Sequence, residues 1–271
     1  RLRDLIVMDL DREVCPEKVV WCSSKDKEIK DLPNVGLEGD RYYGPMETVG
    51  EWVPYDGVVM SVDPSGRGKD ETTWSVVAIK SGMLYLLDTG GVMDGFSPEA
   101  LRTLSERARD YGANEVICEQ NFGGGAFTEL LKRALREAGY PVTVTDVHHT
   151  KMKEKRILDA LEPVWANHRL VVDKTLIERD FESTKGYENG NTYRLFYQAS
   201  RMQRRKGAVK HDDRIDALSM AVAYWDKAVG MTQDEGIERR RERLLDAELQ
   251  QFAKNDRLGR LDQEDNHLKW F

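Results

Sequence analysis

From residue 57 onward, short apolar runs rich in β-branched residues alternate with segments of helical spacing. The runs predict strands at residues 58–62, 73–79, 83–87, 116–118 and 142–147, with a further short extended piece at 170–172. Helical spacing and capping residues predict helices over 97–112, 127–135, 151–165 and 212–226. The order βββαβαβα predicts an α/β layer fold with a mixed central sheet flanked by helices.

Composition excludes several classes of protein. The 271 residues suffice for one large domain, or one domain with appendages, and carry a net charge of −7. No apolar run approaches the roughly 18–20 residues needed to cross a bilayer. The three cysteines include no Cys-x-x-Cys pair, so neither a disulfide framework nor a thiolate zinc site is indicated. A reducing cytoplasm fits these features best.

Patterning along the chain predicts three parts. Residues 1–56 mix short apolar patches with charges, glycine and proline, and we interpret them as a linker or the end of a preceding, missing domain. Residues 57–228 form the predicted α/β domain. Residues 229–271 are highly charged and predict an amphipathic helical tail, either a mobile terminus or a partner-binding arm. Because the chain starts without Met, we expect it to be a piece of a longer protein.

Acidic side chains fall where α/β sheets place their functional sites. Asp63 ends the first predicted strand and Glu119 the fourth, so parallel neighbours would bring both to one carboxyl edge. Asp212, Asp213 and Asp216 open the last helix, and Asp213 is in line with one of its apolar faces. A buried acid is costly unless it is paired or binds a cation. Mg²⁺ and Mn²⁺ prefer oxygen ligands, so the pattern predicts a site for two divalent ions of the kind used in phosphoryl transfer.

Each acid also has a purely structural explanation. Asp63 precedes Pro64 and could be a turn residue, while Asp212 could be only a helix N-cap. Asp216 could pair with a neighbouring arginine. The joint placement of all three positions favours the metal centre.

Two basic clusters flank these acids in the sequence. One precedes the last helix and contains Arg201, Arg204, Arg205, Lys206 and Lys210; the other contains Lys151, Lys153, Lys155 and Arg156. Cations beside an acidic site suit a polyanion whose phosphates must approach metal-bound carboxylates. We therefore predict DNA contacts there, the alternative being two solvated loops.

Two glycine-rich segments are poor phosphate loops. Residues 65–70 resemble a Walker A loop, but Asp63 and Asp70 stand where that pattern requires glycine and a hydroxyl residue. We expect no ATPase motif in this chain. Residues 123–125 could cradle a phosphate or serve only as a flexible turn before a helix.

Three motifs, in sequence order, resemble the nuclease domain of the terminase large subunit of tailed bacteriophages, of the DNA maturase B type. They are Val58 to Asp63 with Pro64-Ser65-Gly66, Cys118-Glu119-Gln120-Asn121, and His211-Asp212-Asp213-Arg214-Ile215-Asp216-Ala217-Leu218, and the match covers roughly residues 50–228. The resemblance implies a ribonuclease H-like fold and a Mg²⁺- or Mn²⁺-dependent endonuclease that cuts concatemeric double-stranded viral DNA during genome packaging. It also implies that Asp63, Glu119 and Asp213 bind the metal ions, with Asp212 or Asp216 as a further ligand.

The same resemblance implies partners and a location. These are an N-terminal ATPase domain in the full-length protein, a portal protein, a small terminase subunit, and the procapsid in the host cytoplasm. Two other hypotheses fit the sequence. A Holliday-junction resolvase-like nuclease would prefer four-way junctions, and a non-catalytic DNA-clamping or portal-docking module would bind DNA without metal.

Overall fold

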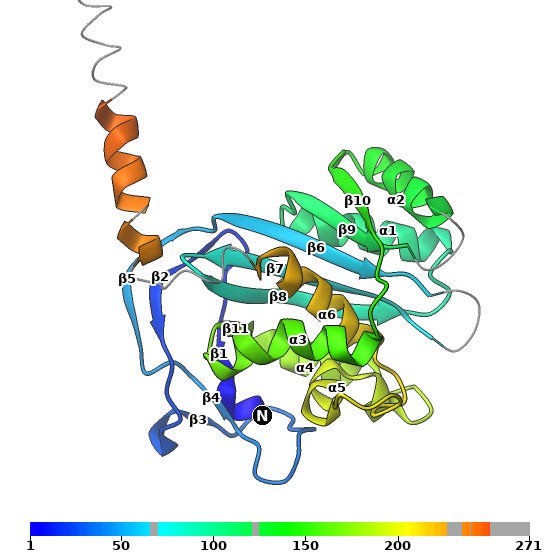
Figure 1. Ribbon diagram of the computed structural model, residues 1–271, viewed down its shortest axis with the longest axis horizontal. Helices are drawn as coiled ribbons and strands as arrows, with labels where there is room; N and C mark the ends of the chain where they lie inside the picture. Colours follow the sequence, from blue (N-terminus) through cyan, green and yellow to red (C-terminus); the bar gives the residue numbers. More distant parts are fainter. Residues whose placement is uncertain (66–69, 121–124, 227–234, 239, 250–271) are drawn as a thin grey trace, which may run out of the picture.

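A seven-stranded mixed sheet forms the centre of the computed structural model, which describes residues 1–65, 70–120, 125–226, 235–238 and 240–249 (Figure 1). Its order is β1-β11-β8-β7-β6-β9-β10. The strands are β1 (Ile6–Met8), β6 (Gly57–Asp63), β7 (Thr72–Lys80), β8 (Met83–Val92), β9 (Glu115–Glu119), β10 (Thr143–Val147) and β11 (Leu170–Asp173). Within this sheet β7 alone is antiparallel to its neighbours, so the carboxyl ends of the other six strands share one edge.

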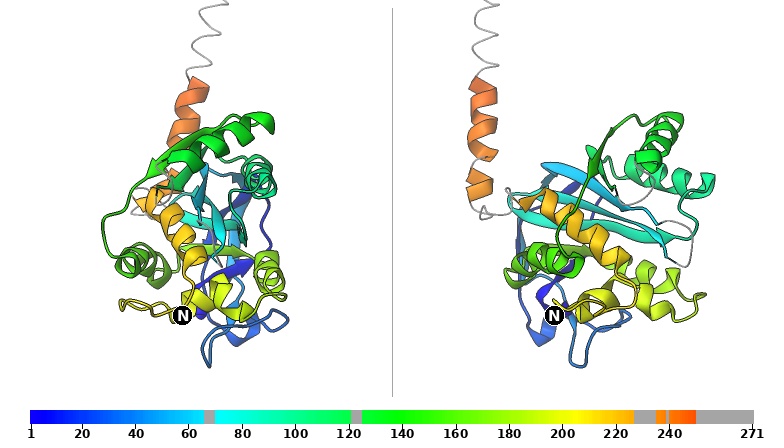
Figure 2. Two further views of the ribbon diagram at one scale, coloured as in Figure 1. Left: turned by 90° about the vertical axis from the view of Figure 1, so that its right-hand side faces the viewer. Right: turned by 45° about the vertical axis from the view of Figure 1, so that its right-hand side comes forward.

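Helices cover both faces of the sheet, as Figure 2 shows, and confirm the predicted α/β layers. The helices are α1 (Pro98–Asp110), α2 (Ala126–Glu137), α3 (Lys153–Ala166), α4 (Lys174–Ser183), α5 (Leu195–Arg201) and α6 (Asp213–Tyr224). Apolar residues of α1 and α2 pack into one core cluster, and those of α3, α4, α5 and α6 into a second. Each helix therefore buries its apolar face against the sheet or a neighbouring helix.

Local signals explain several element boundaries. Ser97 caps α1 because its hydroxyl accepts a hydrogen bond from the Ala100 amide at 3.1 Å. Ser81 and Gly82 both have positive φ, 47° and 78°, which suits the two-residue turn that joins β7 to β8. These features agree with the predicted helix start and hairpin.

Helix α6 is the most completely buried helix in its setting. Ile215, Leu218 and Val222 are buried on one side, and Ala217 and Ala221 on the other. This arrangement matches the two apolar faces in the sequence. Because α6 packs directly on β6 and β7, it holds its acidic first turn near the end of β6.

The N-terminal region contributes to the central sheet, which the predicted boundary at residue 56 did not anticipate. Strand β1 pairs in parallel with β11, with Ile6 opposite Val171. Its apolar side chains join the core, and the partner strand is too distant in sequence for the pairing to be visible there. The rest of this region forms two small antiparallel sheets: β2 (Val14–Val20) with β5 (Glu47–Pro54), and β3 (Glu28–Ile29) with β4 (Tyr42–Tyr43).

The segment after β11 is more helical than predicted. It contains α4, α5 and a 3-10 turn at Gly190–Tyr193, where the sequence indicated only a polar region. Residues 235–238 and 240–249 are helical and extend away from the body near β2 and β5 (Figure 1). The glycine-rich predictions at 66–69 and 121–124, and the tail beyond 249, lie outside the described residues. No described helix is long and apolar enough to span a membrane.

Candidate metal centre

Three buried carboxylates meet at the carboxyl edge of the sheet. Asp63 and Glu119 end β6 and β9, which pair in parallel with Val62 opposite Cys118. Asp216 lies in the first turn of α6 and is fully buried. One oxygen from each of these acids lies within 4.8 Å of the others. We call Asp63, Glu119 and Asp216 the buried acidic group.

The buried acidic group is unfavourable without a cation. Burial raises the pKa of Asp63 well above its ordinary value, and the negative charges of Asp216 and Glu119 raise it further, while Lys153 opposes the shift. Oxygen Oε2 of Glu119 is buried and has no hydrogen-bond partner among the described residues. Closely spaced oxygen donors with an unsatisfied buried atom are a suitable ligand set for a divalent cation such as Mg²⁺ or Mn²⁺.

Two side chains of α3 supply positive charge to this group. The Lys153 ammonium is 3.1 Å from Asp216, 3.6 Å from Asp63 and 2.8 Å from Asp212. The Arg156 guanidinium donates to Asp216 at 2.9 Å and to Glu119 at 3.3 Å. Burial lowers the pKa of Lys153, but the surrounding carboxylates outweigh this effect and raise it, so the ammonium is charged.

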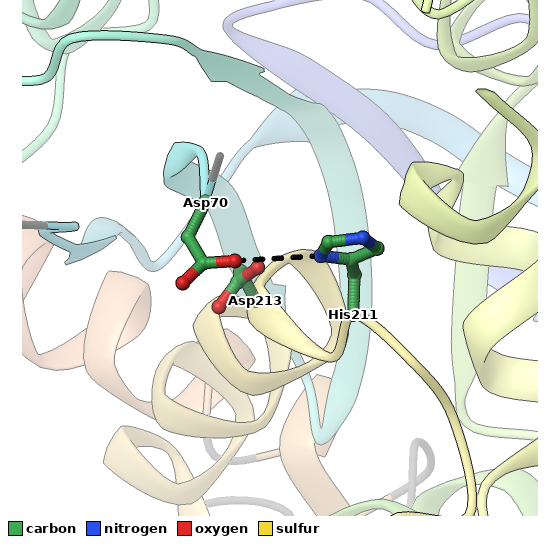
Figure 3. Close-up of side chains that lie close together, drawn as sticks. All are labelled: Asp70, His211 and Asp213. Atoms are coloured by element: carbon green, nitrogen blue, oxygen red, sulfur yellow. Dashed lines mark ion pairs between the residues drawn. The ribbon is translucent and has the colours of Figure 1, made fainter. Parts of the chain in front are cut away.

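A second group lies beside the first and contains a histidine. Asp70, His211 and Asp213 each offer a ligand atom, and these atoms lie within 4.8 Å of one another (Figure 3). We call them the mixed group. Burial raises the pKa of Asp213 to about 7, and the nearby charges of Asp212 and Asp70 contribute, while Lys153 opposes the shift. Burial also lowers the pKa of His211, which favours the neutral imidazole.

A buried arginine fixes the backbone next to both acids of the mixed group. Arg214 follows Asp213 and binds both carboxylate oxygens of Glu71, which follows Asp70, at 2.9 and 2.8 Å. Its remaining amino group donates to Asp180 of α4 at 2.8 Å. All three side chains are almost fully buried. The start of α6 is thereby tied to the start of β7.

The structure divides the predicted acidic ligands between two places. Asp216, expected as an additional ligand, lies with Asp63 and Glu119, whereas Asp213 lies with Asp70 and His211. Asp212 takes the N-cap position of α6, but its side chain makes no capping bond and pairs with Lys153. The roles of these residues as metal ligands stay predictions.

Sequence reasoning missed several contributors to this region. Asp70 was treated only as a residue that spoils a phosphate loop, and His211 and Arg214 were given no role. The motif itself carried a signal, because His211 and Arg214 directly flank its two aspartates. Their convergence with Asp70 and Glu71 joins segments about 140 residues apart.

The predicted DNA-binding residues also have different surroundings. Lys153 lies among the acids, Arg204 pairs with Asp159 and Glu162 of α3, and the Arg201 guanidinium donates to the carbonyl oxygen of Val35. These three are engaged within the protein. The remaining predicted contacts, Arg205, Lys206, Lys210 and Lys151, are exposed.

Comparison with known proteins agrees with this fold. Residues 62–170 match the family model described as Terminase Bacteriophage T7, Ribonuclease H-like domain. The chain is 38% identical over 229 residues to the terminase large subunit of Enterobacteria phage T3, an alignment that covers 83% of this chain and 38% of the relative. The chain thus spans less than half the length of that relative.

Solved structures of similar fold come from several viruses. The human cytomegalovirus terminase nuclease domain, Mn soaked and inhibitor bound, is 12% identical, with a TM-score of 0.45 over 63% of this chain and 83% of that one. The nuclease domain of gp2 from bacterial virus Sf6 is 14% identical, with a TM-score of 0.42 over 63% of this chain and 90% of that one.

The mixed sheet, its flanking helices and the family match define a ribonuclease H-like α/β domain. The chain belongs to the T7-type terminase large-subunit family, which confirms the resemblance read from its three motifs.

Proposed function

We propose that this chain is a metal-dependent endonuclease domain that hydrolyses phosphodiester bonds of concatemeric double-stranded viral DNA during genome packaging. The observation that carries the proposal is the buried acidic group: three carboxylates within 4.8 Å at the carboxyl edge of the sheet. The family assignment supports the same activity.

Asp63, Glu119 and Asp216 would hold a divalent cation, Mg²⁺ or Mn²⁺, and a second ion would involve Asp213 and Asp212. Bound cations would supply Lewis acidity, which activates a water molecule and stabilises the leaving oxygen in phosphodiester hydrolysis. The carboxylates hold and orient this centre. Burial excludes bulk water around them and strengthens their attraction for cations.

Lys153 would act together with this centre. Its ammonium now neutralises several carboxylates, so cation binding would release it from them. Since α3 begins at Lys153, a small change at the helix start lets the side chain turn outward toward a DNA phosphate. Arg156, bound to Glu119 and Asp216, would keep those two acids oriented.

Double-stranded DNA would be held by phosphate contacts with little reading of base sequence. The exposed cations Arg205, Lys206, Lys210 and Lys151 are the candidates for these contacts. Further proposed partners are an ATPase domain of the full-length protein, a portal protein and a small terminase subunit, with the procapsid in the host cytoplasm as the place of action.

Plasmid cleavage by the purified chain in Mg²⁺, Mn²⁺ or EDTA tests the proposal. We expect metal-dependent nicking and linearisation that falls at least about 100-fold in Asp63→Asn and Glu119→Gln, since a catalytic metal supplies several kcal/mol of transition-state stabilisation. Glu129→Gln, an exposed acid on α2, is the matched control and should cleave normally.

Two results would contradict the proposal. Undiminished cleavage by Asp63→Asn would place the chemistry elsewhere. Intact plasmid in every sample, with metal-independent DNA binding retained, would favour the docking module. A parallel assay on a four-way junction and a linear duplex of the same sequence separates the resolvase hypothesis, which requires preference for the junction.

A further inference from the structure

We infer that Asp70, His211 and Asp213 form a second cation site that takes a transition-metal ion such as Mn²⁺ through one imidazole nitrogen and two carboxylates. This inference rests on the proposed function, because it names residues that would hold the second ion of the nuclease centre. It adds Asp70 and His211 as ligands, and a nitrogen donor favours Mn²⁺ and later transition metals over Mg²⁺.

The geometry of the mixed group suits a shared ion. The Asp70 and Asp213 carboxyl groups point toward the same space as the His211 ring (Figure 3). Nδ1 of His211 is 3.5 Å from Oδ1 of Asp70, longer than the roughly 2.7–3.2 Å of an ordinary N–H···O bond. Two neighbouring ligands, each about 2.0–2.2 Å from one ion, lie at a comparable separation.

The His211 ring is buried without a hydrogen bond that would explain its position. Its side chain is only 8% exposed, and within the described part of the chain Nε2 has no partner. A buried polar atom without a partner is costly. Because Nδ1 faces the two carboxylates, a metal ion there would give the ring a strong partner.

Surrounding contacts hold the three ligands in place. The Tyr193 ring stacks on His211 with centroids 3.9 Å apart and an angle of 20°. The Thr73 hydroxyl donates to the Asp213 carbonyl at 2.9 Å. The Arg214–Glu71 pair fixes the residues next to Asp213 and Asp70. Such fixed ligand positions reduce the ordering cost of binding.

The mixed group adjoins the buried acidic group without sharing a carboxylate with it. Lys153 is 3.6 Å from Asp63 and 3.9 Å from Asp213, so one ammonium reaches both groups. Ions in the two groups would therefore be neighbours, as a two-ion phosphodiester centre requires.

Electron paramagnetic resonance of Mn²⁺ bound to the purified chain tests this inference without an activity measurement. Electron spin-echo modulation from a directly bound ¹⁴N is expected in the wild type and is expected to disappear in His211→Asn. Asp70→Asn should weaken Mn²⁺ binding at this site about 10-fold or more, while folding normally, because Asp70 is 68% exposed.

Two histidine variants serve as controls. His168→Asn lies far from the site, at a φ of 54° that asparagine tolerates, and His149→Asn lies near Glu119 and Asp216. Both should retain the nitrogen signal. Loss of the signal in His149→Asn but not in His211→Asn would overturn the inference, and so would a wild type without nitrogen coupling. Either result leaves the proposed function standing if Asp63→Asn still abolishes cleavage.

Discussion

A single lysine accounts for the charge balance of the candidate centre. Lys153 lies within 4 Å of Asp63, Asp212, Asp213 and Asp216, where a cation would otherwise neutralise them. At such distances opposite charges interact strongly in a partly buried site. The lysine thus stabilises the metal-free centre and competes with metal ions for the same carboxylates.

Lys153→Ala is therefore expected to bind Mn²⁺ several-fold more tightly than the wild type. Loss of the ammonium leaves the carboxylates uncompensated, so the metal-free variant should also melt at a lower temperature, and saturating Mn²⁺ should restore much of the loss. Calorimetric titration and thermal denaturation measure both effects.

Lys151→Ala removes an exposed lysine two residues away and is the matched control. It should leave Mn²⁺ affinity and the melting temperature nearly unchanged. Weaker Mn²⁺ binding by Lys153→Ala would show that the lysine supports the metal site instead of competing for it.

At the scale of elements, the position of α6 decides which acids meet. Arg214 joins this helix to Glu71 before β7 and to Asp180 of α4, and all three side chains are buried. Asp180 also accepts the Leu195 amide at 3.0 Å, which adds α5 to the same network. One ionic network therefore sets how α6 sits against the sheet.

Arg214→Met is expected to destabilise the fold strongly. It leaves two buried carboxylates without their partner, which costs about 3–5 kcal/mol in the free energy of unfolding. For a domain of this size the melting temperature should fall by roughly 10 °C. Differential scanning calorimetry measures the change.

The matched control is Arg133→Met on α2, where an exposed arginine pairs with Glu137 one turn away. Such surface pairs contribute little, so its melting temperature should stay close to that of the wild type. Equal shifts in the two variants would contradict the importance of the buried network.

At the scale of the whole molecule, regular patterns predicted the fold and part of the site. The ends of two β-branched runs identified Asp63 and Glu119, because parallel strands bring their carboxyl ends to one edge. Pairing of β1 with β11 was not predictable in this way, since 165 residues separate Ile6 from Val171 and no local signal links them. The same limit applies to Asp70 and His211.

The third acid shows where periodicity stops being informative. Asp213 and Asp216 lie three residues apart on a helix that is buried on both sides, so the helical pattern alone could not decide which of them faces Asp63. Packing of α6 brings Asp216 to Asp63 and directs Asp213 to His211. Lys153 resembled a DNA-contacting residue because its acidic surroundings come from distant segments.

The central claim is that the buried acidic group binds divalent cations. Anomalous diffraction at the manganese edge from crystals soaked in MnCl₂ tests it most directly. The account predicts a strong peak bounded by Asp63, Glu119 and Asp216, with the Lys153 ammonium displaced from these carboxylates. Absence of a peak at this position under saturating Mn²⁺, with Lys153 still bound to Asp216, would contradict the claim.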